Sequence, residues 1–145
     1  MPSLVGSEMC IRDSPRRSRG VPRCRGEEVN ISHLPIQAEI WWVDFGAGAP
    51  GEPAGARPAL ILAPTIEDIE HMPTVAVIPF TRRERTYRYR LPIEPTEENG
   101  LATRTFAQID LIRTVARQRL EGSIGYLEHE PWDEIRALVS EFLDL

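Results

Sequence analysis

The 145-residue sequence contains no lysine, and all 17 of its basic residues are arginine. The planar guanidinium presents a fork of N–H donors that matches phosphate oxygens, so this composition supplies groups suited to an anionic ligand. Both cysteines, Cys10 and Cys24, lie near the start of the chain. The remainder has none, which is compatible with a reducing cytoplasm and argues against a zinc site.

Several other features are missing, and each excludes a class of protein. No stretch approaches the roughly 20 apolar residues that a membrane-spanning helix needs, and the opening residues lack the apolar segment of a signal peptide. Neither the phosphate loop of nucleotide hydrolases nor a nucleophile elbow occurs. His33, His71 and His129 do not have the spacing of metal ligands. We therefore expect a soluble protein that uses no metal and no cofactor.

Charge and periodicity divide the chain near residue 37. Residues 1–37 hold six arginines against four acidic residues, whereas the rest carries a net charge of −7. Residues 3–14 resemble translated sequencing-adapter read-through, which does not belong to a fold. The alternative is a disordered basic tail that touches nucleic acid. We predict a disordered or artefactual extension over residues 1–37 and one folded domain over residues 38–145.

The folded part reads as mostly β-structure followed by one helix. Short apolar and β-branched segments between Gly, Pro and Asn turns predict strands over residues 39–45, 57–63, 74–80, 87–93, 106–112 and 122–127. The helix is predicted to have Pro131 as its first residue. It carries one apolar stripe at helical spacing: Ile135, Leu138, Val139 and Phe142. This pattern predicts a compact antiparallel sheet or small barrel finished by an amphipathic helix.

Arg57 is the first candidate site residue. It stands at the mouth of a strand, directly after the loop of residues 46–56, which is rich in glycine, alanine and proline and contains Glu52. A cation fixed by a strand beside a flexible loop suits an anionic ligand such as phosphate. The alternative is an ordinary strand start with a solvated arginine.

Thr81 is the second candidate, because it is the first polar residue after the apolar strand of residues 74–80. It is followed by an arginine cluster: Arg82, Arg83, Arg85, Arg88 and Arg90. A hydroxyl at a strand end beside such a cluster suits contacts to a phosphodiester. Alternatively, the arginines keep an exposed sheet edge soluble.

Asp110 is the third candidate. It lies inside an apolar run, where a carboxylate is expected to be paired, and Arg113 or Arg57 could serve as its partner. A structural ion pair is the alternative to a catalytic role.

Five segments occur in an order that carries a family resemblance: EIWWVDF (39–45), GEPAGARPALIL (51–62), VIPFT (77–81), DLIRTV with the later RL (110–120), and IGYL (124–127). Together with the final helix they resemble the MazF/PemK family of toxin–antitoxin ribonucleases. The resemblance covers about residues 39–145. It implies a small SH3-like antiparallel barrel, usually a homodimer, whose members cut single-stranded RNA at short sequences without a metal.

The resemblance also implies roles for named residues. In the MazF branch the pair most tied to cleavage corresponds to Arg57 and Thr81. A guanidinium and a hydroxyl aimed at the non-bridging oxygens would stabilise the charge that builds as the ribose 2′-hydroxyl attacks phosphorus. Glu52 and Asp110 are rival candidates for the general base, Asp110 matching the base of the PemK branch. That branch has an arginine where this chain has Gln108, which favours the Arg57/Thr81 version.

The expected partners are single-stranded RNA and a cognate antitoxin whose tail folds over the RNA site. The predicted RNA-facing arginines are Arg82, Arg83, Arg85 and Arg88; the local field they create, and not the net charge, governs the encounter with RNA. Two other functions stay open. One is a cleavage-inactive barrel that binds RNA or an antitoxin. The other, less expected from the C-terminal sequence EFLDL, is a gyrase poison of the CcdB type.

Overall fold

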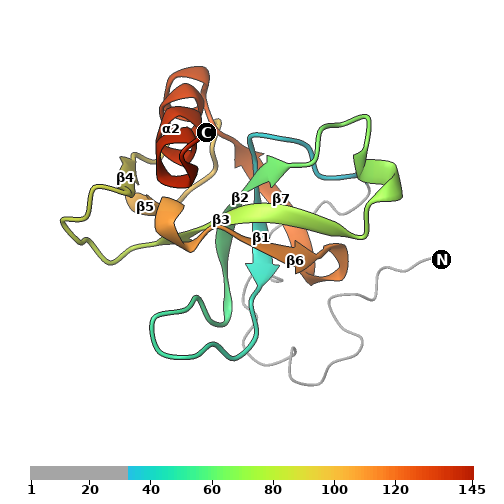
Figure 1. Ribbon diagram of the computed structural model, residues 1–145, viewed down its shortest axis with the longest axis horizontal. Coiled ribbons are helices and arrows are strands. Elements are labelled where there is room, and N and C mark those ends of the chain that lie inside the picture. Colours follow the sequence, from blue (N-terminus) through green and yellow to red (C-terminus); the bar gives the residue numbers. More distant parts are fainter. Residues whose placement is uncertain (1–32) are drawn as a thin grey trace.

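The structure, a computed structural model, describes residues 33–145, so both interpretations offered for residues 3–14 lie outside the described residues. The described part contains seven strands, one α-helix and three 3-10 helices (Figure 1). The strands are β1 (Glu39–Asp44), β2 (Ala56–Ala63), β3 (Thr74–Thr81), β4 (Arg90–Ile93), β5 (Thr105–Gln108), β6 (Arg113–Ala116) and β7 (Leu120–Tyr126). The helices are η3 (Ile69–His71), η4 (Ile109–Leu111), η5 (Arg117–Arg119) and α2 (His129–Leu143). In residues 33–145 we find no helix with the length and apolarity of a membrane span.

β3 is the centre of an antiparallel sheet. Along one edge it pairs with β2, which continues to β1 and β7. Along the other edge the end of β3 pairs with β5, which continues to β4, and the start of β3 pairs with β6. The outermost strands β4 and β7 do not pair with each other in this part of the chain, so the sheet stays open. The expected mostly-β fold with a C-terminal helix is confirmed, as an incompletely closed barrel.

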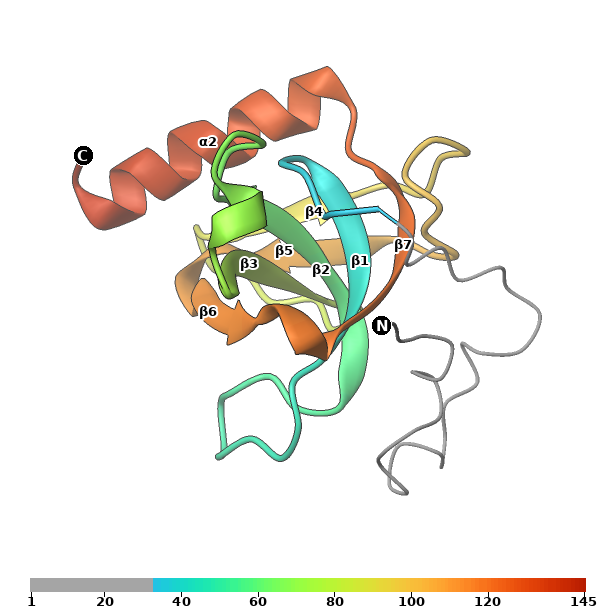
Figure 2. The ribbon, with the colours of Figure 1, turned by 90° about the vertical axis from the view of Figure 1, so that its right-hand side faces the viewer.

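The central strands are buried on both faces. Leu60 and Ile61 are neighbours in β2 and both fully buried, yet they belong to different apolar clusters because successive strand residues point to opposite faces. The cluster of Leu60 is covered by α2 through Ile135 and Val139, and Figure 2 shows this helix lying across one side of the strands. The cluster of Ile61 is closed by β6 through Val115. The two cores fix the neighbouring ends of β2 and β3, where the candidate site lies.

Three expectations about individual elements are wrong. The strand predicted over residues 106–112 ends at Gln108, and η4 then buries Ile109 and turns the chain so that β6 can also pair with β3. The strand predicted over residues 87–93 begins only at Arg90, whose N–H closes a turn onto the carbonyl of Tyr87 at 3.3 Å. Pro131 is the third residue of α2 and not the first, which the helix tolerates because first-turn N–H groups have no intrahelical acceptor.

Candidate functional site

The loop between β1 and β2 projects away from the strands (Figure 1). Its neck is closed by two backbone hydrogen bonds, from Phe45 N to Gly55 O at 3.0 Å and from Gly55 N to Gly46 O at 2.7 Å. Gly46 and Gly55 have φ values of +71° and +73°, a conformation that glycine adopts without steric cost. The closed neck returns the chain to the sheet directly before Arg57.

Arg57 is half-buried and held by its own loop. Its Nε and Nη2 donate to the carbonyl oxygen of Ala54 at 3.2 and 3.0 Å. Burial lowers the pKa of Arg57 below its ordinary value, because the charged guanidinium loses water. A guanidinium carries five N–H donors, so an oriented cation keeps further donors that have no partner within residues 33–145. Arg57 is therefore placed and oriented to receive an anion.

Thr81 lies across the sheet from Arg57. The paired register of β2 and β3 ends with Ala59 and Pro79, and Arg57 and Thr81 each lie two residues beyond that pair on their own strand. The Thr81 hydroxyl oxygen accepts a hydrogen bond from Arg83 N at 3.2 Å, which leaves its O–H free to donate. The two residues that the sequence singled out thus lie at the adjoining ends of neighbouring strands.

Two adjacent cavities share Arg57 and Thr81 in their walls. Cavity 1, of about 720 Å³, is lined by Trp42, Ala56, Arg57, Pro58, Phe80, Thr81, Arg82, Gly100, Leu101, Ala102, Thr103, Thr105, Ser123 and Ile124. Cavity 2, of about 470 Å³, is lined by Gly51, Glu52, Pro53, Arg57, Thr81, Arg83, Arg85, Tyr87, Arg90, Gln108, Asp110 and Leu111. Cavity 1 therefore has two arginines and no carboxylate, whereas cavity 2 has four arginines and two carboxylates.

Asp110 is paired, as its apolar surroundings required, but the expected partner was wrong. Its two carboxylate oxygens accept hydrogen bonds from Nε and Nη2 of Arg90 at 3.0 and 3.2 Å. Arg57 instead contacts its loop, and Arg113 lies over the ring of Phe45 at 5.4 Å. The partner comes from β4 because η4, which carries Asp110, is tied to the residues just before that strand.

The other predicted residues divide between the cavities. Glu52 is exposed on the wall of cavity 2, and its carboxylate accepts a hydrogen bond from Ala49 N at 3.3 Å. Arg82 lines cavity 1, whereas Arg83 and Arg85 line cavity 2. Arg88 lines neither cavity and pairs with Glu141 on α2. The structure thus brings three of the four predicted RNA-facing arginines to the candidate site.

Sequence reasoning missed one residue of cavity 1 and the burial of one residue of cavity 2. Trp42 is half-buried on the wall of cavity 1, whereas its neighbour Trp41 is buried in the core. The alternation of faces along β1 could have separated the two. The sequence places Arg90 in the arginine cluster after Thr81, but its side chain is only 8% exposed. The sequence feature that could have indicated its burial is Asp110, whose carboxylate lies in an apolar run and needs a cationic partner.

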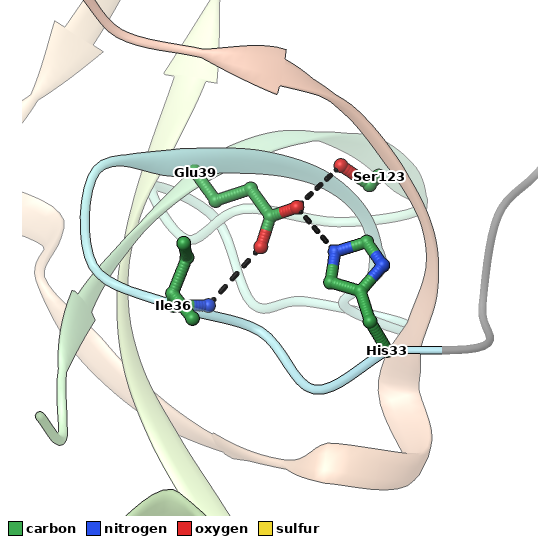
Figure 3. Close-up of polar contacts among 4 residues, drawn as sticks. All are labelled: His33, Ile36, Glu39 and Ser123. Carbon is green, nitrogen blue, oxygen red and sulfur yellow. Dashed lines mark hydrogen bonds and ion pairs between the residues drawn. The ribbon is translucent and has the colours of Figure 1, made fainter. Parts of the chain in front are cut away.

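A separate polar cluster surrounds the carboxylate of Glu39 (Figure 3) and includes Ser123, which lines cavity 1. Glu39 is fully buried, and one of its oxygens contacts His33 Nε2 at 2.6 Å and the hydroxyl of Ser123 at 2.7 Å. The other oxygen accepts the N–H of Ile36 at 3.1 Å. These contacts satisfy the buried carboxylate and join the residues before β1 to β7. The cluster is no metal site, since residues 33–145 contain no group of three or more His, Cys, Asp and Glu that could hold an ion.

Comparison with known protein families gives one match over most of the chain. Residues 36–143 match the model of a family described as PemK-like, MazF-like toxin of type II toxin–antitoxin system. The matched range includes every residue of β1–β7 and both cavities.

Solved structures show the same fold. A crystal structure of MazF from Deinococcus radiodurans superposes with a TM-score of 0.67 at 22% identity, covering 78% of this chain and 99% of that one. An endoribonuclease in complex with its cognate antitoxin from a mycobacterial species gives 0.61 at 20% identity, covering 77% and 96%. The Mycobacterium tuberculosis toxin MazF-mt6 gives 0.60 at 24% identity, covering 74% and 97%. At these identities the similarity establishes the fold alone.

Proposed function

Because the chain belongs to the PemK-like, MazF-like toxin family of type II toxin–antitoxin systems, we propose that it is a toxin that cuts single-stranded RNA, such as mRNA, at short specific sequences. MazF-like toxins are endoribonucleases as a family. The observation that carries the proposal for this chain is that Arg57 and Thr81, at the adjoining ends of β2 and β3, both line the two cavities.

The proposed reaction needs no metal. The ribose 2′-hydroxyl loses its proton and attacks the adjacent phosphorus, and the bond to the 5′-oxygen breaks as that oxygen takes up a proton from water. The products are a 2′,3′-cyclic phosphate and a 5′-hydroxyl. Negative charge builds on the non-bridging oxygens in the transition state. The unused N–H donors of Arg57 and the O–H of Thr81 would bind those oxygens more strongly there than in the ground state.

The proton of the 2′-hydroxyl needs an acceptor, and cavity 2 offers two carboxylates. Both oxygens of Asp110 face the guanidinium of Arg90, so a proton would have to compete with a charge-assisted pair. Within residues 33–145 Glu52 has one longer contact, from Ala49 N at 3.3 Å, and it lies on the projecting loop beside Arg57. We therefore favour Glu52 as the general base.

The difference between the cavities suggests how one strand would lie across the site. The four arginines of cavity 2 suit the sugar–phosphate backbone. Cavity 1 has Trp42 on its wall and fewer charges, which suits a stacked base next to the cleaved phosphate. Contacts to that base would supply the sequence preference.

The test is cleavage of a long single-stranded RNA by the purified protein in the presence of EDTA, with Arg57→Ala alongside. We expect a small set of cut sites, ends that carry a 2′,3′-cyclic phosphate, and loss of cutting in the variant. Arg136→Ala is the matched control, because this exposed arginine of α2 lies outside both cavities.

Two results would overturn the proposal. Absence of cleavage by the unaltered protein, with RNA still bound, would favour the cleavage-inactive barrel. Equal cleavage by Arg57→Ala would show that another site or a contaminating nuclease cuts the RNA.

The proposed partners follow from the family. A mycobacterial endoribonuclease with this fold has been solved with its cognate antitoxin. By analogy we infer that this chain acts in the cytoplasm as a homodimer and is inhibited by an antitoxin encoded beside it. Co-expression with the neighbouring open reading frame tests this inference: we expect co-purification and suppressed RNA cleavage, and independent elution with full cleavage would contradict it.

A further inference from the structure

Arg90 differs from the other arginines around it. Its side chain is 8% exposed, whereas that of Arg88, two residues earlier, is 63% exposed and pairs with Glu141 on α2. Arg90 nevertheless lies on the wall of cavity 2, which also contains Arg57 and Thr81. A buried guanidinium beside the proposed phosphate-binding site has less conformational freedom than one on the surface.

Asp110 fixes the direction of this guanidinium. The pair is bidentate, with Nε and Nη2 of Arg90 at 3.0 and 3.2 Å from the two carboxylate oxygens. The geometry leaves three of the five N–H donors of Arg90, which are the second hydrogen on Nη2 and both hydrogens on Nη1. The guanidinium carbon of Arg90 also lies 5.1 Å from the centroid of the Tyr87 ring.

The backbone segments that carry Arg90 and Asp110 are fixed by strand pairing and by a hydrogen bond between them. Arg90 opens β4 and stands opposite Gln108 of β5 in the sheet register. Asp110 lies in η4, whose first N–H, from Ile109, donates to the carbonyl of Tyr89 at 3.0 Å. A cation supported from two connected elements keeps its position better than one on a free loop.

The surrounding charge favours an anion. Cavity 2 contains four arginines, and Glu52 and Asp110 are its two carboxylates. Asp110 thus orients one cation without cancelling the positive field of the cavity.

We propose that Arg90 is a second phosphate-binding guanidinium and that Asp110 is a positioning residue which acts through it. This inference rests on the proposed function, since the ligand is a backbone phosphate of the same RNA strand that Arg57 and Thr81 hold. It gives Asp110 a role other than proton acceptor, and it adds Arg90 to the site beside Arg57 and Thr81.

Kinetics on the full chain separate positioning from proton transfer. The variants are Asp110→Asn, Arg90→Ala and the double variant, with Arg104→Ala as the control because this exposed arginine lies outside both cavities. Loss of a charge-assisted contact predicts that each single variant loses about 10- to 100-fold in kcat/KM, mainly through KM. The double variant should be no worse than Arg90→Ala, and the acid limb of the pH–rate profile should stay in place.

The contrary outcomes are distinct. If Asp110 is the base, Asp110→Asn loses about 10²–10⁴-fold in kcat and the acid limb disappears. If the pair is only structural, both variants unfold at lower temperature while cleavage per folded molecule is unchanged. Arg90→Lys keeps the charge but not the fork, so it should recover part of the loss and confirm that the chain still folds. A cleaving parent protein with inactive Arg57→Ala would leave the proposed function intact under either outcome.

Discussion

The two cavities meet at the same pair of residues, yet their walls have different chemistry. Cavity 2 gathers four arginines and two carboxylates, whereas cavity 1 holds Trp42, Phe80 and several small polar residues with no carboxylate. Two carboxylates illustrate the difference. Glu39 contacts Ser123 of the cavity 1 wall, and Asp110 is itself part of the cavity 2 wall. Glu39 is fully buried and engaged by three partners, but Asp110 is 27% exposed and engaged by one guanidinium.

The difference separates structural from functional charge. A buried carboxylate whose partners satisfy it holds the fold together and offers a ligand little. A carboxylate at the edge of a cavity, paired on one side only, can direct its partner toward a ligand. On this basis Glu39 stabilises the wall of cavity 1 through Ser123, and we propose that Asp110 orients Arg90 on the wall of cavity 2.

The largest expected effect is on the rate of RNA cleavage, from a substitution of Thr81, which lines both cavities. Thr81→Val keeps the shape of the side chain and removes the hydroxyl, so kcat for RNA cleavage should fall by about 10²–10³-fold with little change in RNA affinity. Rapid-mixing cleavage assays and a separate binding titration check this. Thr74→Val, at the opposite end of β3 and outside both cavities, is the matched control. A loss confined to affinity would place Thr81 in binding and not in transition-state stabilisation.

The next effect tests cavity 1. Replacing Trp42 with alanine removes the proposed stacking surface, and base stacking on an aromatic side chain is worth about 1–3 kcal/mol. RNA affinity should fall accordingly, and the set of cut sites should broaden when mapped by sequencing of the product ends. Trp42→Phe should retain most of both properties. Unchanged cut sites in the alanine variant would remove cavity 1 from sequence recognition.

A stability measurement tests the carboxylate behind cavity 1. Glu39→Gln replaces one of two carboxylate oxygens, each of which accepts a hydrogen bond, by an amide N–H₂ group, which should lower the free energy of unfolding by about 1–3 kcal/mol. Denaturant unfolding compares it with Glu134→Gln, an exposed position on α2. Cleavage per folded molecule should not change. A stable variant with impaired cleavage would reverse the assignment and make Glu39 functional.

The smallest effect is expected at the rim of cavity 2. Arg83→Ala should weaken RNA binding several-fold and reduce the slope of log affinity against log salt by about 0.7, the contribution of one phosphate contact to single-stranded nucleic acid. Binding titrations over a range of salt concentrations measure this slope. Identical slopes for the variant and the parent protein would show that Arg83 makes no phosphate contact.

Much of the fold could be predicted because local pattern and final structure agree. The apolar runs that became β1, β2 and β3 are buried on both faces, and turn residues bound each of them. The prediction failed at Ile109, where an apolar run continues in sequence but the chain turns through η4. The spacing of apolar residues predicts which side chains are buried, but a buried residue in a 3-10 helix gives the same pattern as one in a strand. The two differ in whether the segment pairs with another strand, and that strand is distant in sequence.

The candidate site was predicted in part for the same reason. Arg57 and Thr81 stand at strand ends, so their positions follow from where the strands begin and end. The partner of Asp110 depends instead on the contact of η4 with the start of β4, which brings Arg90 within reach. Neighbours in sequence, such as Arg113, were the natural candidates without that contact. The predicted start of the domain at residue 38 stays a prediction, and residues His33 and Ile36 contact Glu39 in the structure.

The central claim is that Arg57 and Thr81 act on one phosphate, and a double-mutant cycle tests it most directly. Single-turnover cleavage would be measured for the parent protein, Arg57→Ala, Thr81→Val and the double variant, all in EDTA. Groups that stabilise the same transition state show strongly non-additive losses. We predict that the double variant cleaves little more slowly than the worse single variant. Losses that multiply fully would contradict the account, because they would mean that the two residues act independently.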